Sequence, residues 1–311
     1  MRTRTTFSLA IGTCLIGLAG PALALNIALT NDDGYSAVGI QVMKTALEAA
    51  GHRVTLAAPL TDQSGASMAL DQEPLTVKKW DENVYSVALR NNQALGAKPS
   101  NSAYVAVAIA QEGGLPADLL ISGINTSANI GMSAPLSGTV GAASHAVASV
   151  LNGPVPALAI GTDEPNCDAT CKQAHYEVVA NFMVRFIAHL QTKPGFLASE
   201  SGLLPRGVGL IVSYPATDAV AGVKIGVQSE GILQNGAKVS GEIRCTSPCS
   251  ALAIGGTRTA LPVLAPDYGP EVKDSDLGYY TEGYVTIVPI RPDLTAPNPL
   301  VFRSILPGFL P

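Results

Sequence analysis

Hydrophobic and polar positions follow two alternating patterns in the first two thirds of the chain. Short apolar runs, typical of buried parallel strands, lie at residues 25–30, 53–57, 118–122 and 156–160. Between them, apolar residues recur at helical spacing over 40–50, 100–111, 138–151 and 173–190. This alternation predicts βαβ units and therefore a doubly wound, mostly parallel α/β sheet with helices on both faces.

The pattern changes near Gly207. Short strands separated by Gly, Pro and Ser are expected at 208–212, 223–227, 239–243 and 251–254, and a late strand at 284–290 returns to the main body. We therefore divide the chain into a Rossmann-like core at 25–206 and a β-rich C-terminal extension at 207–311. In such cores, ligands bind outside the carboxyl ends of the strands.

The first 24 residues have the pattern of a cleaved signal peptide. Arg2 and Arg4 precede an apolar run at 7–18, and Ala22-Leu23-Ala24 supplies a small-x-small cleavage site. Cleavage after Ala24 would give a periplasmic or secreted protein. Cys14 would allow a lipoprotein anchor, but Thr13 before it fits that motif poorly. No later run reaches about 18 apolar residues, so stable membrane insertion is not expected.

The amino-acid composition limits the classes of molecule that the protein could bind. Hydrophobic residues make up 47% of the chain and charged residues 14%, which is ample material for a core, and the net charge is −5 without a basic tract. These values argue against nucleic-acid polymers as partners. A small anionic substrate would need local attraction from a metal ion or from backbone N–H groups.

Four cysteines follow the signal peptide, namely Cys167, Cys171, Cys245 and Cys249. They form two C-x-x-x-C pairs, and an even count in an exported chain favours disulfides. Local bridges are the simplest pairing, although the sequence also allows bridges between the pairs. A four-thiolate zinc site is the alternative.

The segment Asn31-Asp32-Asp33-Gly34 follows the first strand. Two adjacent carboxylates at the end of a buried strand repel one another unless a cation is present. Oxygen ligands of this kind suit Mg²⁺ or Mn²⁺. The alternative is a simple Asx turn, for which the same four residues are equally suited.

Three further polar segments stand near strand or helix ends. Ser64 lies in a Ser-Gly-Ala-Ser loop, and Asn125 follows the strand at 118–122, with Asn129 close behind. Ser137-Gly138-Thr139 opens a helix, where free N–H groups and the two hydroxyls could bind an anion. Helix capping by either hydroxyl is the simpler structural role, and it is compatible with phosphate binding.

The four motifs N-D-D-G, S-G-A-S, S-G-I-N and S-G-T-V, in this order and at these spacings, resemble the survival protein SurE family of 5′-nucleotidases. The resemblance extends over about residues 26–290 and implies a SurE-like fold that forms homodimers or homotetramers. It also implies a divalent ion, Mg²⁺ or Mn²⁺, bound by Asp32, Asp33, Ser64 and Asn125, with both aspartates catalytic. We expect Asn31, Asn129, Ser137, Gly138 and Thr139 to bind the substrate phosphate.

The implied function is hydrolysis of nucleoside monophosphates, with 3′-nucleotides and short polyphosphate as further substrates of some members. The chain departs from the family pattern at residues 98–102, Lys-Pro-Ser-Asn-Ser, and at Ser127, where the family usually has Gly. These departures bear on base preference and assembly more than on hydrolysis, and two alternatives remain open. One is an exported acid phosphatase of broad specificity, and the other is a non-catalytic nucleotide-binding protein.

Overall fold

The computed structural model describes residues 23–148, 154–192, 203–217, 219–234, 237–267 and 269–293. The predicted signal peptide therefore lies outside the described residues, apart from its last two positions. The same holds for the end of the helix expected at 138–151 and for the tail beyond residue 293.

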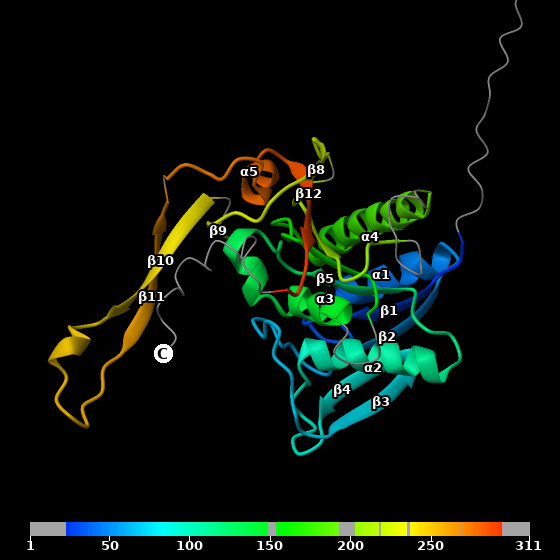
Figure 1. The fold of residues 1–311 in the computed structure, drawn as a ribbon, viewed down its shortest axis with the longest axis horizontal. Coiled ribbons are helices and arrows are strands. Elements are labelled where there is room, and N and C mark those ends of the chain that lie inside the picture. The colour runs from blue at the N-terminus through cyan, green and yellow to red at the C-terminus, as the bar shows by residue number, and fades with distance from the viewer. Residues whose placement is uncertain are drawn as a thin grey trace, which may run out of the picture.

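The main sheet contains strands from both halves of the chain. Its members are β1 (Asn26–Thr30), β2 (Arg53–Pro59), β3 (Leu75–Asp81), β4 (Val84–Leu89), β5 (Leu119–Asn125), β6 (Ala157–Thr162), β7 (Gly209–Tyr214), β8 (Gly222–Ile225) and β12 (Tyr284–Ile290). They lie in the order β3-β4-β2-β1-β5-β6-β7-β12-β8 (Figure 1). The six strands from β4 to β7 are parallel, whereas β3 and β12 run antiparallel to β4 and β7. The predicted doubly wound, mostly parallel sheet is confirmed.

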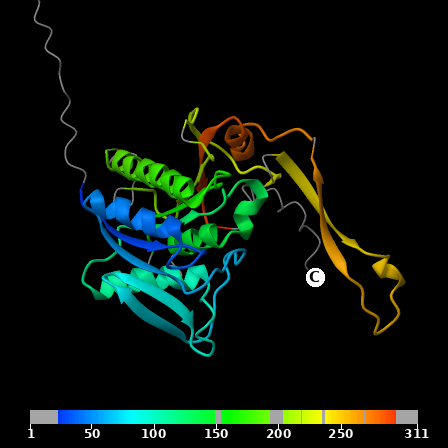
Figure 2. The same cartoon turned by 180° about the vertical axis from the view of Figure 1, so that it is seen from behind.

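Four helices cover the two faces of this sheet. They are α1 (Val38–Ala49), α2 (Pro99–Glu112), α3 (Gly138–Ala148) and α4 (Ala169–Gln191). Helices α1 and α4 lie together on one face, and α2 and α3 on the other (Figures 1 and 2). Within the described parts, no helix has the length and apolar character needed to cross a membrane.

The central strand β1 shows why its sequence is continuously apolar. Ile27 and Leu29 belong to the core beneath α1 and α4, while Ala28 between them belongs to the core beneath α2 and α3. Successive side chains point to opposite faces of a sheet, so a strand covered on both faces must be apolar at every position.

A second, smaller sheet is formed by β9 (Ile232–Gln234), β10 (Ala237–Cys245) and β11 (Ala260–Pro266). The antiparallel pair β10–β11, called here the arm, projects away from the main body (Figures 1 and 2). Helix α5 (Asp276–Thr281) then leads the chain back to β12 in the main sheet.

The prediction of a strand at 251–254 is wrong. A 3₁₀ turn occupies Cys249–Ala251, and the chain then loops around the tip of the arm until β11 begins at Ala260. Ile254 is fully exposed there. Because the tip has no neighbouring strand to pair with, a short apolar run is not enough to form one.

The hairpin of β3 and β4 was not predicted. All but the first two side chains of β3 are exposed, including Lys78 and Lys79, because this strand forms the edge of the sheet. An edge strand with charged side chains lacks the clean apolar alternation that identifies a half-buried strand.

Both cysteine pairs form local disulfides. Cys167–Cys171 spans the start of α4, and Cys245–Cys249 lies at the tip of the arm. With their sulfur atoms bonded to one another, these cysteines supply no thiolates for the four-cysteine zinc alternative.

Candidate active site

The predicted site segments meet at one edge of the sheet. Strands β2, β1 and β5 are parallel neighbours, so the loops after them share that edge. Asn31-Asp32-Asp33-Gly34 follows β1, the Ser64 loop follows β2, and Asn125 ends β5. The N–H of Gln63 donates to the backbone oxygen of Asp32 at 2.8 Å, which joins the first two loops. This edge is where open α/β sheets bind ligands.

Asp32 is buried, at 2% exposure, and is held by the start of α3. Its Oδ1 accepts a hydrogen bond from Thr139 Oγ1 at 2.5 Å, and its Oδ2 accepts one from the Thr139 N–H at 3.1 Å. Burial raises the pKa of Asp32, and the bonds from Thr139 oppose that rise. A carboxylate at a helix N-terminus is also stabilised by the helix dipole.

A glycine makes this approach possible. A Cβ atom at Gly138 would lie 3.0 Å from Asp32 Oδ2 and 2.9 Å from Pro99 Cγ. Any larger residue would push the start of α3 away from the carboxylate. On the other face, a Cβ at Gly39 would lie 2.3 Å from the backbone oxygen of Ile124, so α1 packs equally closely on β5 beside Asn125.

Asp33 is half-buried and lacks such support. Its Oδ1 accepts a bond from Thr126 Oγ1 at 3.3 Å, whereas its Oδ2 is buried without a hydrogen-bond partner. Burial and the neighbouring charge of Asp32 raise the pKa of Asp33 to about 7. A buried carboxylate oxygen without a donor is costly, and a cation would relieve that cost.

The anion seat expected at Ser137-Gly138-Thr139 is used within the protein. The Thr139 N–H and hydroxyl bind Asp32, and Ser137 Oγ accepts the Val140 N–H at 3.2 Å as a helix cap. The start of α3 therefore binds the protein's own carboxylate, which lies close enough to take these donors first.

The three asparagines differ in which side-chain amide atoms lack a hydrogen-bond partner. Both amide atoms of Asn31 bond to the backbone of Gly34, so Asn31 shapes the turn. Asn125 donates its Nδ2 to the backbone oxygen of Ser127 at 2.8 Å, which leaves its Oδ1 as the remaining polar atom. Asn129 is 3% exposed, and its Nδ2 is buried without a partner.

Ser64 is exposed, and its hydroxyl donates to Asp62 Oδ1 at 2.7 Å. Ser64, the expected ligand, is thus next to Gln63, whose N–H bonds to Asp32. The Ser64 hydroxyl itself is bonded to a different carboxylate, that of Asp62. Asp62 and Gln63 were missed by sequence reasoning, although they stand directly before Ser64. So was the placement of Lys98, whose Nζ donates to Gln63 Oε1 at 3.1 Å.

The donor chemistry fits a hard divalent cation. Nowhere in the described residues do three or more His, Cys, Asp or Glu side chains gather as a metal-binding group. The site instead combines two carboxylates with amide and hydroxyl oxygens, the ligand types that Mg²⁺ and Mn²⁺ prefer. The unpartnered Oδ2 of Asp33 is the clearest available ligand atom.

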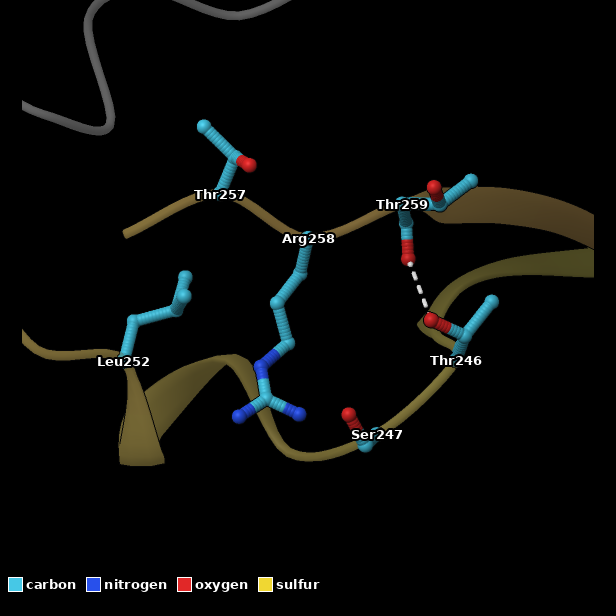
Figure 3. Close-up of a pocket in the computed structure, with 6 residues that line it drawn as sticks. All are labelled: Thr246, Ser247, Leu252, Thr257, Arg258 and Thr259. Atoms are coloured by element: carbon cyan, nitrogen blue, oxygen red, sulfur yellow. Dashed lines mark hydrogen bonds between the residues drawn. The ribbon is translucent and has the colours of Figure 1, made fainter. Parts of the chain in front are cut away.

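A hollow of about 450 Å³ lies away from this site, at the tip of the arm (Figure 3). It is lined by Thr246, Ser247, Leu252, Thr257, Arg258 and Thr259. Thr246 Oγ1 donates to the backbone oxygen of Thr259 at 3.2 Å across it. Neither Asp32 nor Asp33 lines this hollow, so the hollow is separate from the candidate site.

A model of the family described as Survival protein SurE matches residues 27–235. The chain belongs to this family. It is 34% identical over 171 residues to the 5′-nucleotidase SurE of Stenotrophomonas maltophilia R551-3, an alignment that covers 55% of this chain and 59% of that protein. It is 29% identical over 278 residues to the 5′-nucleotidase SurE of Xanthomonas campestris pv. campestris B100, covering 87% and 91% of the two chains.

The fold agrees with a solved SurE structure. The crystal structure of the SurE protein from Aquifex aeolicus superposes with a TM-score of 0.67 at 24% identity, covering 90% of this chain and 98% of the other.

The bond between Thr139 and Asp32 can be tested by Thr139→Val, which keeps the shape of the side chain and removes the hydroxyl donor. We expect the free energy of unfolding, measured with urea in chelator, to fall by about 1.5–3 kcal/mol, because a buried carboxylate loses a donor. Thr139→Ser keeps the donor and should lose only about 0.8 kcal/mol for the buried methyl. A valine variant as stable as the serine variant would show that the hydroxyl contributes nothing.

Proposed function

We propose that this chain is a metal-dependent phosphomonoesterase that hydrolyses nucleoside 5′-monophosphates, with a range that extends to 3′-nucleotides and short polyphosphate. The observation that carries the proposal is the pair of adjacent carboxylates at the carboxyl end of β1, of which Asp32 is buried and the half-buried Asp33 has an unpartnered oxygen. Membership of the SurE family and the relatives named 5′-nucleotidase SurE support the same activity.

Asp32, Asp33, Ser64 and Asn125 would hold the ion, which we propose is Mg²⁺ or Mn²⁺. When bound, such an ion supplies polarisation of a phosphoryl oxygen and a water of lowered pKa. The hydroxyl of Ser64 has to turn away from Asp62 to join this set. Its place in an exposed loop leaves room for that rotation.

The two aspartates have different parts in this proposal. Asp32 has both oxygens engaged by Thr139 and is therefore held in one orientation. Asp33 has the only oxygen of the pair without an intramolecular partner, so it is the carboxylate able to face the reacting group. The Nδ2 of Asn129 is a buried donor available for a phosphate oxygen. Attack on phosphorus by water and by Asp33 itself are both compatible with this arrangement.

A non-catalytic binding protein fits these observations less well. Two carboxylates beside a bound phosphate repel it unless a cation lies between them. A protein that only captures nucleotides gains nothing from Asp32 and Asp33 at this place, whereas a metal-dependent hydrolase needs them.

The proposal predicts that the protein releases phosphate from AMP with Mn²⁺ or Mg²⁺ and that EDTA abolishes the release. Asp33→Asn should lose nearly all of this activity, because it removes a charge beside the ion while keeping the side-chain shape. Asp81→Asn is the matched control, since Asp81 is an exposed aspartate at the end of β3. It should keep full activity. Release that ignores both EDTA and Asp33→Asn would place the site elsewhere.

The same assay separates the alternatives when 3′-AMP, GMP and p-nitrophenyl phosphate are compared with AMP. Equal turnover of all four would favour the broad-specificity acid phosphatase. Binding of AMP without phosphate release under any condition would favour the nucleotide-binding protein.

We further propose that the protein acts outside the cytoplasm as a homodimer or homotetramer. The apolar N-terminal segment ending at Ala24 and the two local disulfides support export. Native mass spectrometry of the protein from its producing cells should give chains that begin at Leu25, in assemblies of two or four. An uncleaved N-terminus would contradict the proposed export. A monomer at micromolar concentration would contradict the proposed oligomer.

A further inference from the structure

The loop at residues 128–132, called here the Asn129 loop, connects the candidate site to the C-terminal extension. A Cβ atom at Gly161 would lie 3.0 Å from Asn129 Nδ2, which places that amide over the end of β6. Gly161 pairs with Asn125 in the sheet, so the Asn129 amide lies beside an expected ion ligand. Its unpartnered Nδ2 is therefore a donor in the site whose position depends on the loop.

Asp276 holds this loop from the other side. It is 1% exposed and begins α5. Its Oδ2 accepts the Gly131 N–H at 2.9 Å, and its Oδ1 accepts the N–H groups of Ser229 and Leu277, both at 2.8 Å. One buried carboxylate thus joins the Asn129 loop to two segments of the extension, and a carboxylate with several N–H donors makes strong, directional bonds.

Other contacts leave the loop little freedom on this side. Gln228 Nε2 donates to the Gly131 oxygen at 2.9 Å, and the Met132 N–H donates to the Gly231 oxygen at 2.9 Å. Gly131 has φ +54°, and a Cβ there would lie 2.2 Å from the Gly231 oxygen. Such close approach requires the two segments to keep one relative position, which their shared bonds to Asp276 maintain.

Packing supports the same arrangement. Ile130, beside Asn129, is 1% exposed and forms a small apolar cluster with Leu277 and Tyr280 of α5. The Tyr280 hydroxyl donates to Asp163 Oδ2 at 3.0 Å, and Asp163 Oδ1 accepts the Ala128 N–H at 3.0 Å. The extension therefore contacts the Asn129 loop at both of its ends.

We propose that Asp276 is a positioning residue for the substrate, which acts by holding the Asn129 loop so that Asn129 Nδ2 donates to a phosphate oxygen. This inference rests on the proposed function and adds a residue from the extension to it. Asp276 does not touch the substrate, and its effect passes through Gly131 to Asn129.

A double-mutant cycle with AMP tests the connection. Asp276→Asn, which keeps the side-chain shape, should lower kcat roughly tenfold with little change in KM, because misplacement of a donor is felt mainly in the transition state. Asn129→Ala should lower kcat by at least as much. The double variant should be no slower than Asn129→Ala alone, because residues that act through one contact are not additive.

Glu271→Gln is the matched control. Glu271 is also a carboxylate bonded to Ser229, through the Ser229 hydroxyl at 2.6 Å, but no hydrogen bond of the described residues joins it to the Asn129 loop. Its kcat should stay within about twofold of the wild type, as for a substitution away from the site. Losses that multiply in the double variant, or an equal loss in Glu271→Gln, would reduce Asp276 to a general stabilising role and overturn the proposal.

Hydrogen exchange tests the same idea without turnover. Inorganic phosphate with Mn²⁺ should slow exchange of the 128–132 amides in the wild type and in Glu271→Gln but not in Asp276→Asn. Absence of phosphate release by the wild type would contradict the proposed hydrolase, while this protection would still support the placement of the loop. Equal protection in Asp276→Asn would overturn the inference even if the wild type is active.

Discussion

The repulsion between two adjacent carboxylates, one buried and one half-buried, is the constraint around which this end of the molecule is arranged. Asp32 and Asp33 follow the buried central strand β1, where burial disfavours their charged forms. The protein compensates for only one of them, because Thr139 gives Asp32 two donors while Asp33 Oδ2 receives none. A fold that satisfied both carboxylates internally would have no use for an ion. The uncompensated oxygen is thus the physical link between the structure and the metal-dependent reaction that we propose.

Several features of the fold position the two aspartates and the loops around them. The start of α3 has to reach Asp32, and Gly138 allows that approach, while Gly39 lets α1 pack against β5 on the opposite face. The loop after β2 is joined to Asp32 through Gln63. The C-terminal extension contributes as well, because Asp276 binds the loop that carries Asn129. Parts of the chain that lie far apart in sequence therefore converge on one edge of the sheet.

The local pattern of apolar and polar residues predicted much of this arrangement. The predictions that failed, and the contacts that were missed, have a common cause. The parallel core and β12 were predicted because strand and helix periodicities are local. The N-D-D-G segment was identified because two adjacent carboxylates after a buried strand repel one another unless a cation is present. The binding of Asp32 by Thr139, 107 residues away, and of Gly131 by Asp276, 145 residues away, has no local signal. The intramolecular partners of Ser137 and Thr139, which we expected to bind phosphate, have no local signal either, since they are visible only in three dimensions. The strand expected at 251–254 failed because pairing depends on neighbours that the tip of the arm lacks.

Binding of Mn²⁺ to metal-free protein, followed by isothermal titration calorimetry for the wild type, Asp33→Asn and Asp81→Asn, tests the central claim most directly. The account predicts a single Mn²⁺ site per chain in the wild type and in Asp81→Asn, and loss of that site in Asp33→Asn. Because the measurement needs no substrate, it judges the carboxylate pair independently of any preference for a particular nucleotide. Equally tight binding by Asp33→Asn, or no binding by the wild type, would contradict the account.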